Sequence, residues 1–282
     1  MARTARPLVG AVAVLAFSFA LFGCAGPIPS ARTTPRLSPP VIARPGVLRA
    51  VVDLHYPPFG GISGGQPTGL DVDVASAIAD RLGLRLDVID ARSVEASGLV
   101  QSGRADLLLG GLPVQSVVAT GALFAATYIS DAPAVFSARE ASIGIGDLGN
   151  RRVAVQRDSA AYWLLLDAYG SRRLVVMPTL RDALTAAAEG QVDFAAGDAV
   201  VSGYIMRDLF GLKYNGQLAT GYPLGVGVAS ARPQLASDVR TILDDMAGRG
   251  VLATLRRKWV GDLPEPRMAL DASSSLAATT SP

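Results

Sequence analysis

Residues 46–88 read GVLRAVVDLHYPPFGGISGGQPTGLDVDVASAIADRLGLRLDV, and their pattern changes from strand to helix and back to strand. The run 47–52 is apolar except at its third position, as in a strand that is buried on both faces. Residues 71–82 place apolar side chains on one helical face, and Gly83 supplies the end of this helix. Residues 84–88 alternate between apolar and polar side chains, which predicts a second strand. This order is typical of an α/β fold.

Strand and helix alternate through the rest of the chain, in two rounds. The first round continues with a helix to about Ser102 and a strand at 105–109. The second round has strands at 152–156, 174–177 and 192–196, and helices at 160–169, 180–189 and 199–210. The first two of these helices follow Ser159 and Thr179, which are typical N-cap residues.

Two rounds of strand and helix predict two lobes, each a mostly parallel sheet with helices on both faces. We expect the first lobe to contain residues 46–131 together with 225–262, because the last strand and its two helices have no sheet of their own. The second lobe would contain residues 132–224. Crossovers near residues 129–134 and 219–224 would join the lobes as a two-stranded hinge.

Residues 1–23 are typical of a signal peptide. Arg3 and Arg6 precede an apolar run of about fifteen residues, which is short for a membrane span of roughly twenty. The only cysteine, Cys24, follows Leu21-Phe22-Gly23, a segment that resembles the lipobox at which bacterial lipoproteins are cleaved and acylated. The alternative is a buried or chance cysteine behind an ordinary signal peptide.

Two further segments lack the pattern of a folded domain. Residues 24–45 contain six prolines and no apolar period, so they predict a lipidated linker. Residues 263–282 include runs of serine and threonine and predict a disordered tail. We therefore expect a protein of the cell envelope, lipid-anchored on the outer face of the bacterial cytoplasmic membrane.

The composition argues against several classes of protein. The 282 residues include 26 basic and 24 acidic side chains, and two of the basic ones lie in the signal peptide. A chain without that peptide is neutral and lacks the positive surface of a nucleic-acid-binding protein. One cysteine and one histidine, His55, cannot form a disulfide within the chain or the usual zinc cluster. We expect no metal and no cofactor.

Two short motifs that occur in enzymes lie in the wrong context. Residues 61–65 fit the G-x-S-x-G pattern of serine hydrolases, but they lie in a glycine-rich turn rather than between a strand and a helix. Residues 144–149 fit the G-x-G-x-x-G pattern of dinucleotide-binding proteins, but a strand follows them instead of a helix. Neither motif therefore predicts an enzyme.

Several motifs, by their order and spacing, resemble one known family. They are Gly46-Val47-Leu48-Arg49, Asp53-Leu54-His55-Tyr56-Pro57-Pro58-Phe59, Gly69-Leu70-Asp71-Val72-Asp73-Val74, Gln101-Ser102-Gly103-Arg104-Ala105-Asp106, Gly190-Gln191-Val192-Asp193 and Lys258-Trp259. Together they resemble the type II periplasmic binding proteins, specifically the family 3 solute receptors of polar amino-acid ABC importers. The resemblance implies a monomer that is not an enzyme, closes its two lobes over a small polar solute, and docks on a membrane permease.

The resemblance also implies ligand-binding residues, because ligands of open α/β sheets bind at the carboxyl ends of the strands. Asp53, Tyr56 and Phe59 follow the first strand, where the family contacts its ligand. Asp198 follows the strand at 192–196, and an acid at this place in the family binds the ligand's ammonium group. Ser159 lies at a helix N-terminus, which favours an anion. Lobe packing for the aromatic residues, a structural role for Asp53, and helix capping for Asp198 and Ser159 remain alternatives.

The chain departs from the family in the loop that holds the ligand's α-carboxylate. We expect Gly111 and Gln115 of this loop to contact the solute. By spacing, Pro113 and Gln115 replace two hydroxyl residues, and Val118 replaces the arginine that binds the carboxylate. A buried carboxylate without a partner is very costly. Either the solute lacks this group, or another side chain such as Arg157 supplies the positive charge.

We therefore expect a receptor for a cationic or amine-bearing solute, an amino acid or a related molecule, that serves an ABC importer. Two other functions stay open. The same fold could sense a ligand or bind a partner protein without transport, which the lost arginine position favours. It could also be an enzyme of the dehydratase type, which would use a cleft acid such as Asp198.

Overall fold

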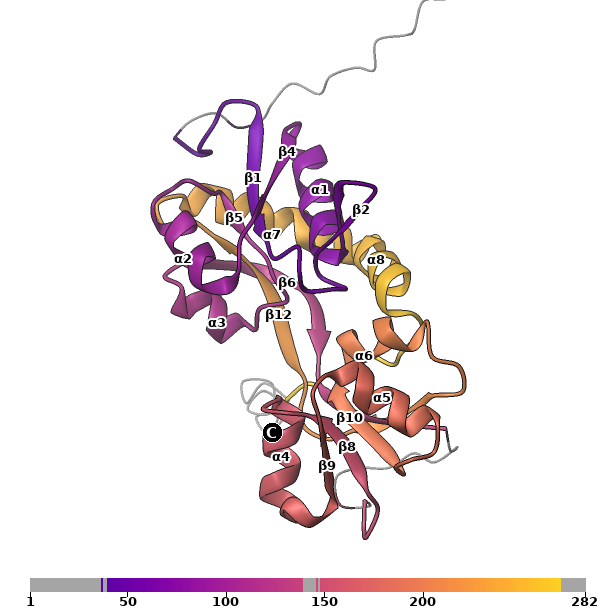
Figure 1. Cartoon of the computed structure of the whole chain (residues 1–282). Coiled ribbons are helices and arrows are strands. Elements are labelled where there is room, and N and C mark those ends of the chain that lie inside the picture. Colours follow the sequence, from indigo (N-terminus) through magenta and orange to yellow (C-terminus); the bar gives the residue numbers. More distant parts are fainter. Residues whose placement is uncertain (1–36, 38–39, 139–145, 147, 270–282) are drawn as a thin grey trace, which may run out of the picture. The chain divides into compact units, whose positions relative to one another are not determined.

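The computed structural model describes residues 37, 40–138, 146 and 148–269 (Figure 1). The predicted signal peptide, Cys24 and most of the predicted linker lie outside the described residues. So does the part of the predicted tail that follows residue 269.

Two five-stranded sheets form the centre of the described part of the chain. The first sheet has the strand order β4-β1-β5-β12-β6. Its strands are β1 (Val47–Val52), β4 (Arg85–Asp90), β5 (Leu107–Leu108), β6 (Leu123–Asp131) and β12 (Tyr222–Val228). The second sheet has the order β11-β7-β10-β8-β9. Its strands are β7 (Pro133–Ser137), β8 (Val153–Gln156), β9 (Leu174–Met177), β10 (Phe194–Asp198) and β11 (Lys213–Gln217).

In each sheet all strands but one run in the same direction. β1 pairs in parallel with β4 and β5, whereas β12 runs antiparallel to its neighbours β5 and β6. β8 pairs in parallel with β9 and β10, whereas β7 runs antiparallel to its neighbours β10 and β11. The prediction of two mostly parallel sheets is confirmed, with β12 and β7 as the reversed strands.

Helices connect the strands and cover the sheets (Figure 1). They are α1 (Leu70–Leu82), α2 (Ser93–Gln101), α3 (Val114–Ala119), α4 (Ala160–Tyr169), the short 3₁₀ helix η2 (Ser171–Arg173), α5 (Leu180–Ala188), α6 (Ala199–Met206), α7 (Pro233–Gly248) and α8 (Val251–Val260). The predicted caps are present: the hydroxyls of Ser159 and Thr179 each accept a backbone N–H at 3.1 Å. Buried side chains of α7 and α8 join the core of the first sheet, as the sequence predicts.

The structure contains elements that the periodicity did not predict. Gly61–Ser63 (β2) and Gln66–Thr68 (β3) form a hairpin whose two-residue turn, Gly64-Gly65, has φ values of 57° and 75°. Two positive φ values are the requirement of a tight turn that matches strand twist. The G-x-S-x-G motif lies in this hairpin, so the strand–helix elbow of a hydrolase is absent there. The helix predicted to end at residue 210 ends at Met206.

Two connections lead from the first sheet to the second: β6 continues into β7 through Ala132, and β11 continues into β12. Both overlap the predicted crossovers, so the two-stranded connection between the lobes is confirmed. Tyr222 and Asp131, at the ends of β12 and β6, are direct partners in the antiparallel ladder. The predicted lobe limits at residues 131 and 224 stay a prediction.

A third segment reaches the same place and corrects the prediction of disorder from residue 263. The N–H of Gly221 donates to the carbonyl of Arg267 at 2.9 Å. The side-chain amide of Gln217 donates to the Arg267 carbonyl at 2.9 Å and accepts the Arg267 N–H at 2.8 Å. Leu263 packs against apolar clusters of both sheets. These contacts hold the segment in place, and composition alone does not reveal them.

Within the described residues, none of the helices is both long and apolar enough to cross a bilayer.

Candidate ligand-binding site

Asp198 ends β10 and precedes α6, but its side chain does not cap that helix. The capping carboxylate comes from Asp131 at the end of β6. Its Oδ1 accepts the N–H of Val200 at 3.0 Å and the N–H of Ala132 at 2.7 Å. Because Asp131, and not Asp198, accepts the N–H of Val200 in the first turn of α6, the Asp198 carboxylate is available for other contacts. The capping alternative for Asp198 is therefore wrong.

The Asp198 carboxylate contacts a tyrosine from the hinge. The hydroxyl of Tyr222 donates to Asp198 Oδ1 at 3.1 Å. Burial raises the pKa of Asp198, and this hydrogen bond opposes the rise. Burial, followed by the charge of Asp198, raises the pKa of Asp131 to about 7, against three backbone N–H donors. Two neighbouring carboxyls with raised pKa values are typical of a functional site.

Tyr56 lies beside this acidic pair and is supported by Phe59. Tyr56 is 40% exposed, and its ring stacks on that of Phe59 with centroids 5.3 Å apart. Partial burial raises the pKa of Tyr56 to about 12, and the charges of four aspartates, Asp198 first, add to the rise. Phe59 is 1% exposed, so Tyr56 rather than Phe59 presents the aromatic surface to solvent.

The loop at Gly111 lies against the same aromatic pair. Gly111 has a φ of 60°, and a Cβ placed on it would lie 2.6 Å from the Phe59 ring. Its N–H donates to Asp71 Oδ2 at 3.1 Å. Gly225 N–H donates to the carbonyl of Leu112 at 3.0 Å, which ties the loop to β12. The glycine is therefore required both for the backbone conformation and for the close approach of Phe59.

Asp71 is buried beneath this loop. Burial raises its pKa to about 7, and the N–H groups of Gly111 and Gly110 oppose the rise. The Tyr128 hydroxyl faces the same carboxyl and lowers its pKa further, although no hydrogen bond of good geometry joins the two. Asp71 Oδ1 is buried and has no hydrogen-bond partner among the described residues. The loop thus rests on a buried acid.

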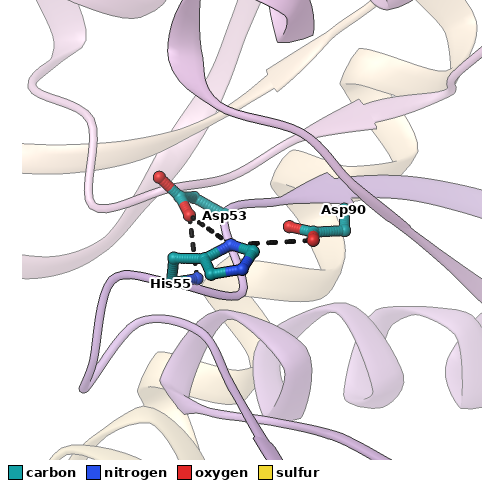
Figure 2. Close-up of side chains that lie close together, drawn as sticks. All are labelled: Asp53, His55 and Asp90. Atoms are coloured by element: carbon teal, nitrogen blue, oxygen red, sulfur yellow. Dashed lines mark hydrogen bonds and ion pairs between the residues drawn. The ribbon is translucent and has the colours of Figure 1, made fainter.

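Asp53 and His55 form a second polar group at the end of β1, with Asp90 from the end of β4 (Figure 2). The Nδ1 of His55 lies 3.7 Å from Asp53 Oδ1 and 3.6 Å from Asp90 Oδ2. Asp53 Oδ1 accepts the N–H of His55 at 2.8 Å, and Asp90 Oδ1 accepts the N–H of Leu54 at 3.0 Å. One ligand atom from each of the three lies within 4.8 Å of the others, so the group could hold a divalent metal ion. An ion pair of His55 with the two carboxylates explains the geometry equally well.

Three predicted residues lie outside the group around Tyr56. Arg157 is exposed, follows β8, and makes no ion pair within the described part of the chain. The Ser159 hydroxyl accepts the Tyr162 N–H, as a helix cap does. Gln115 is exposed on the short helix α3, as is Val118 at 57%. The carboxyl ends of β8 and β10 lie at one edge of the second sheet, so Arg157 and Asp198 share that edge.

The side chains of the hinge itself are not among the predicted site residues. Asp131 and Tyr222 lie in the two predicted crossovers, where the sequence pattern predicts only connections. An acid and a tyrosine within short segments that join two lobes are a signal that could have identified them. Asp71 belongs to the motif at residues 69–74. Its place on a predicted helix does not reveal that its carboxyl faces the loop at Gly111.

The fold and the polar group beside the hinge define a class. Two lobes, each a mixed β-sheet covered by helices, that are joined by two strand connections are the arrangement of type II periplasmic binding proteins. Residues 48–262 match the model of the bacterial extracellular solute-binding proteins, family 3. The chain therefore belongs to this family, which is a family of binding proteins.

Similar proteins include both transport receptors and a sensor. The probable ABC transporter arginine-binding protein ArtJ of Chlamydia trachomatis is 26% identical over 72% of this chain and 82% of its own length. The virulence sensor protein BvgS of Bordetella pertussis is 26% identical over 79% of this chain. The matched region covers 18% of the length of that sensor. The unliganded, open L-cystine solute receptor of Neisseria gonorrhoeae has a TM-score of 0.69, with 18% identity over 80% of this chain and 95% of the receptor. The last likeness concerns the fold alone.

Proposed function

We propose that the chain is an extracytoplasmic lipoprotein that captures a small amine-bearing solute and delivers it to an ABC importer. The family and the likeness to ArtJ support a receptor for small polar solutes. The lobes would close about the strands at Ala132 and Tyr222, because a ligand that contacts both sheets favours the closed form.

The availability of the Asp198 carboxylate carries this proposal. Asp131 caps α6 in its place, and Tyr222 holds Asp198 from the hinge side. The charges that act on Tyr56 at this site are those of aspartates. A solute ammonium group would find a partly buried carboxylate and an aromatic face, which together favour a cation.

Titration calorimetry of amines and amino acids against the full chain tests the proposal. We expect Asp198→Asn to weaken the binding of the best solute about 10–100-fold, since a charge-assisted hydrogen bond contributes about 1.5–3 kcal/mol. Asp244→Asn is the matched control, because Asp244 is an exposed acid of α7. An unchanged affinity in the folded Asp198→Asn protein would rule out the proposed anchor.

The lipid anchor is a separate part of the proposal and rests on Cys24. Cells given labelled palmitate should label the wild-type chain and leave Cys24→Ser unlabelled and released from the membrane fraction. Equal labelling of the two proteins, or none in either, would contradict acylation at this cysteine.

A sensing role is the second candidate, and the likeness to BvgS favours it. Deleting the chain from its host separates the two functions. Loss of uptake of the solute would support transport. Intact uptake with a lost cellular response to the same solute would support sensing through a partner protein.

A further inference from the structure

The loop that would receive an α-carboxylate offers no positive charge. Val118 stands where the resemblance places an arginine, and Pro113 has no N–H to donate. The N–H of Gly111 is already used by Asp71, whose carboxyl lies beneath the loop. A solute carboxylate at this loop would lose its hydration without gaining a cation or a free glycine N–H.

Acids from both sheets lie near Tyr56 instead. Asp198 accepts the Tyr222 hydroxyl at 3.1 Å, and Asp131 accepts the N–H of Val200, two residues after Asp198. Both acids act on the Tyr56 hydroxyl through their charges, and so does Asp53. Asp53 comes from the end of β1 in the first sheet, whereas Asp198 ends β10 in the second.

The Asp53 side has two carboxylates and a single histidine. His55 lies within 3.7 Å of both Asp53 and Asp90, so one imidazole faces two carboxylates (Figure 2). The Asp53 side chain is 23% exposed and that of Asp90 is 40% exposed, so both are within reach of a solute.

We infer that the solute is an aliphatic α,ω-dication without a carboxylate, such as a diamine, with one cationic end at Asp198 and the other at Asp53. This rests on the proposed function and deepens it, since the same anchor is used. The Tyr56 ring, which stacks on Phe59 with centroids 5.3 Å apart, offers an aromatic face that would cover the apolar stem. A dication would also join an acid of each sheet and so favour closure.

Matched pairs of solutes that differ only in the α-carboxylate test the inference. Cadaverine is lysine without this group, and agmatine is arginine without it. By calorimetry on the full chain, we expect each amine to bind at least about tenfold more tightly than its amino acid. Diamines of three to six carbons should show an optimum length, and butylamine should bind at least about tenfold more weakly than the best diamine.

A variant of each acid assigns the two ends. Asp53→Asn keeps an oxygen that accepts the His55 N–H. It should lower the affinity for the best diamine to that for butylamine, and the affinity for butylamine should stay the same. Asp198→Asn should weaken both solutes. Asp244→Asn is again the matched control, and thermal unfolding checks that each variant is folded.

The outcomes separate the inference from the proposed function. If lysine or arginine binds more tightly than its decarboxylated partner while Asp198→Asn still weakens it, the dication is wrong and the proposed function stands. Loss of that preference in Arg157→Gln would then identify Arg157 as the carboxylate partner. If butylamine binds as tightly as every diamine, the proposed contact of a second cationic end with Asp53 is wrong. If no amine or amino acid binds the folded chain, both proposals are wrong.

Discussion

Asp71 and Asp131 are buried carboxyls whose pKa values both rise to about 7, chiefly because burial disfavours their charged forms. Each also accepts backbone N–H groups, Asp71 from Gly111 and Asp131 from Val200. A carboxyl can therefore shape a loop or cap a helix while its own ionisation remains unfavourable. Both acids lie beside groups that we assign to the solute.

The raised pKa of Asp71 predicts how stability depends on pH. The native state holds a proton that the unfolded state loses above pH about 4, so the stability due to this proton is lost as pH rises from about 4 to about 7. Asp71→Asn keeps an acceptor for Gly111 and has no such proton. We expect its unfolding free energy to fall less steeply over this range, by up to about 1.4 kcal/mol per pH unit.

Denaturant unfolding of the ligand-free chain at pH 4.5–7.5 measures this slope. Asp80→Asn serves as the control, because Asp80 is an exposed acid of the same helix, and its slope should match the wild type. Part of the slope should survive in Asp71→Asn, since Asp131 acts in the same direction. Parallel curves for Asp71→Asn and wild type would mean that Asp71 is already ionised in the native state.

At the scale of elements, the predictable parts are those whose pattern is local. β1, α1 and β9 match their predicted limits within one residue, because an apolar run or a helical face is bounded by a glycine or a cap. β6, β7 and β11 were missed. Their residues pair with strands far away in the chain, and that pairing, rather than local periodicity, determines that they are strands.

The candidate site shows the same division. Tyr56 and Asp198 could be named because they follow recognisable strands. The sequence does not reveal that Asp131 caps α6 in place of Asp198. That contact exists because β6 ends next to a helix that begins at residue 199. A local pattern indicates that a helix needs a cap. It does not indicate which of two acids from different strands supplies it.

At the scale of the whole described molecule, three segments pass between the sheets rather than two. β6–β7 and β11–β12 form the hinge, and Arg267 of the C-terminal segment hydrogen-bonds with Gln217 and Gly221 at the two ends of the β11–β12 connection. Gln217 is 8% exposed and exchanges two hydrogen bonds with the Arg267 backbone. A hinge with this additional segment can bend only if the segment moves with it, so the segment contributes to the balance between open and closed forms.

Truncation tests this role of the C-terminal segment. A chain that ends at residue 262 leaves the Gln217 amide without its Arg267 partners and uncovers Leu263 contacts on both sheets. We expect it to lose about 1–3 kcal/mol of unfolding free energy, the cost of leaving buried polar groups unsatisfied. A chain that ends at residue 269 keeps every one of these contacts and is the matched control. Denaturant unfolding compares the two proteins. Equal stability would show that the segment lies on the hinge without holding it, whereas a deficit confined to the shorter chain would make it a structural part of the hinge.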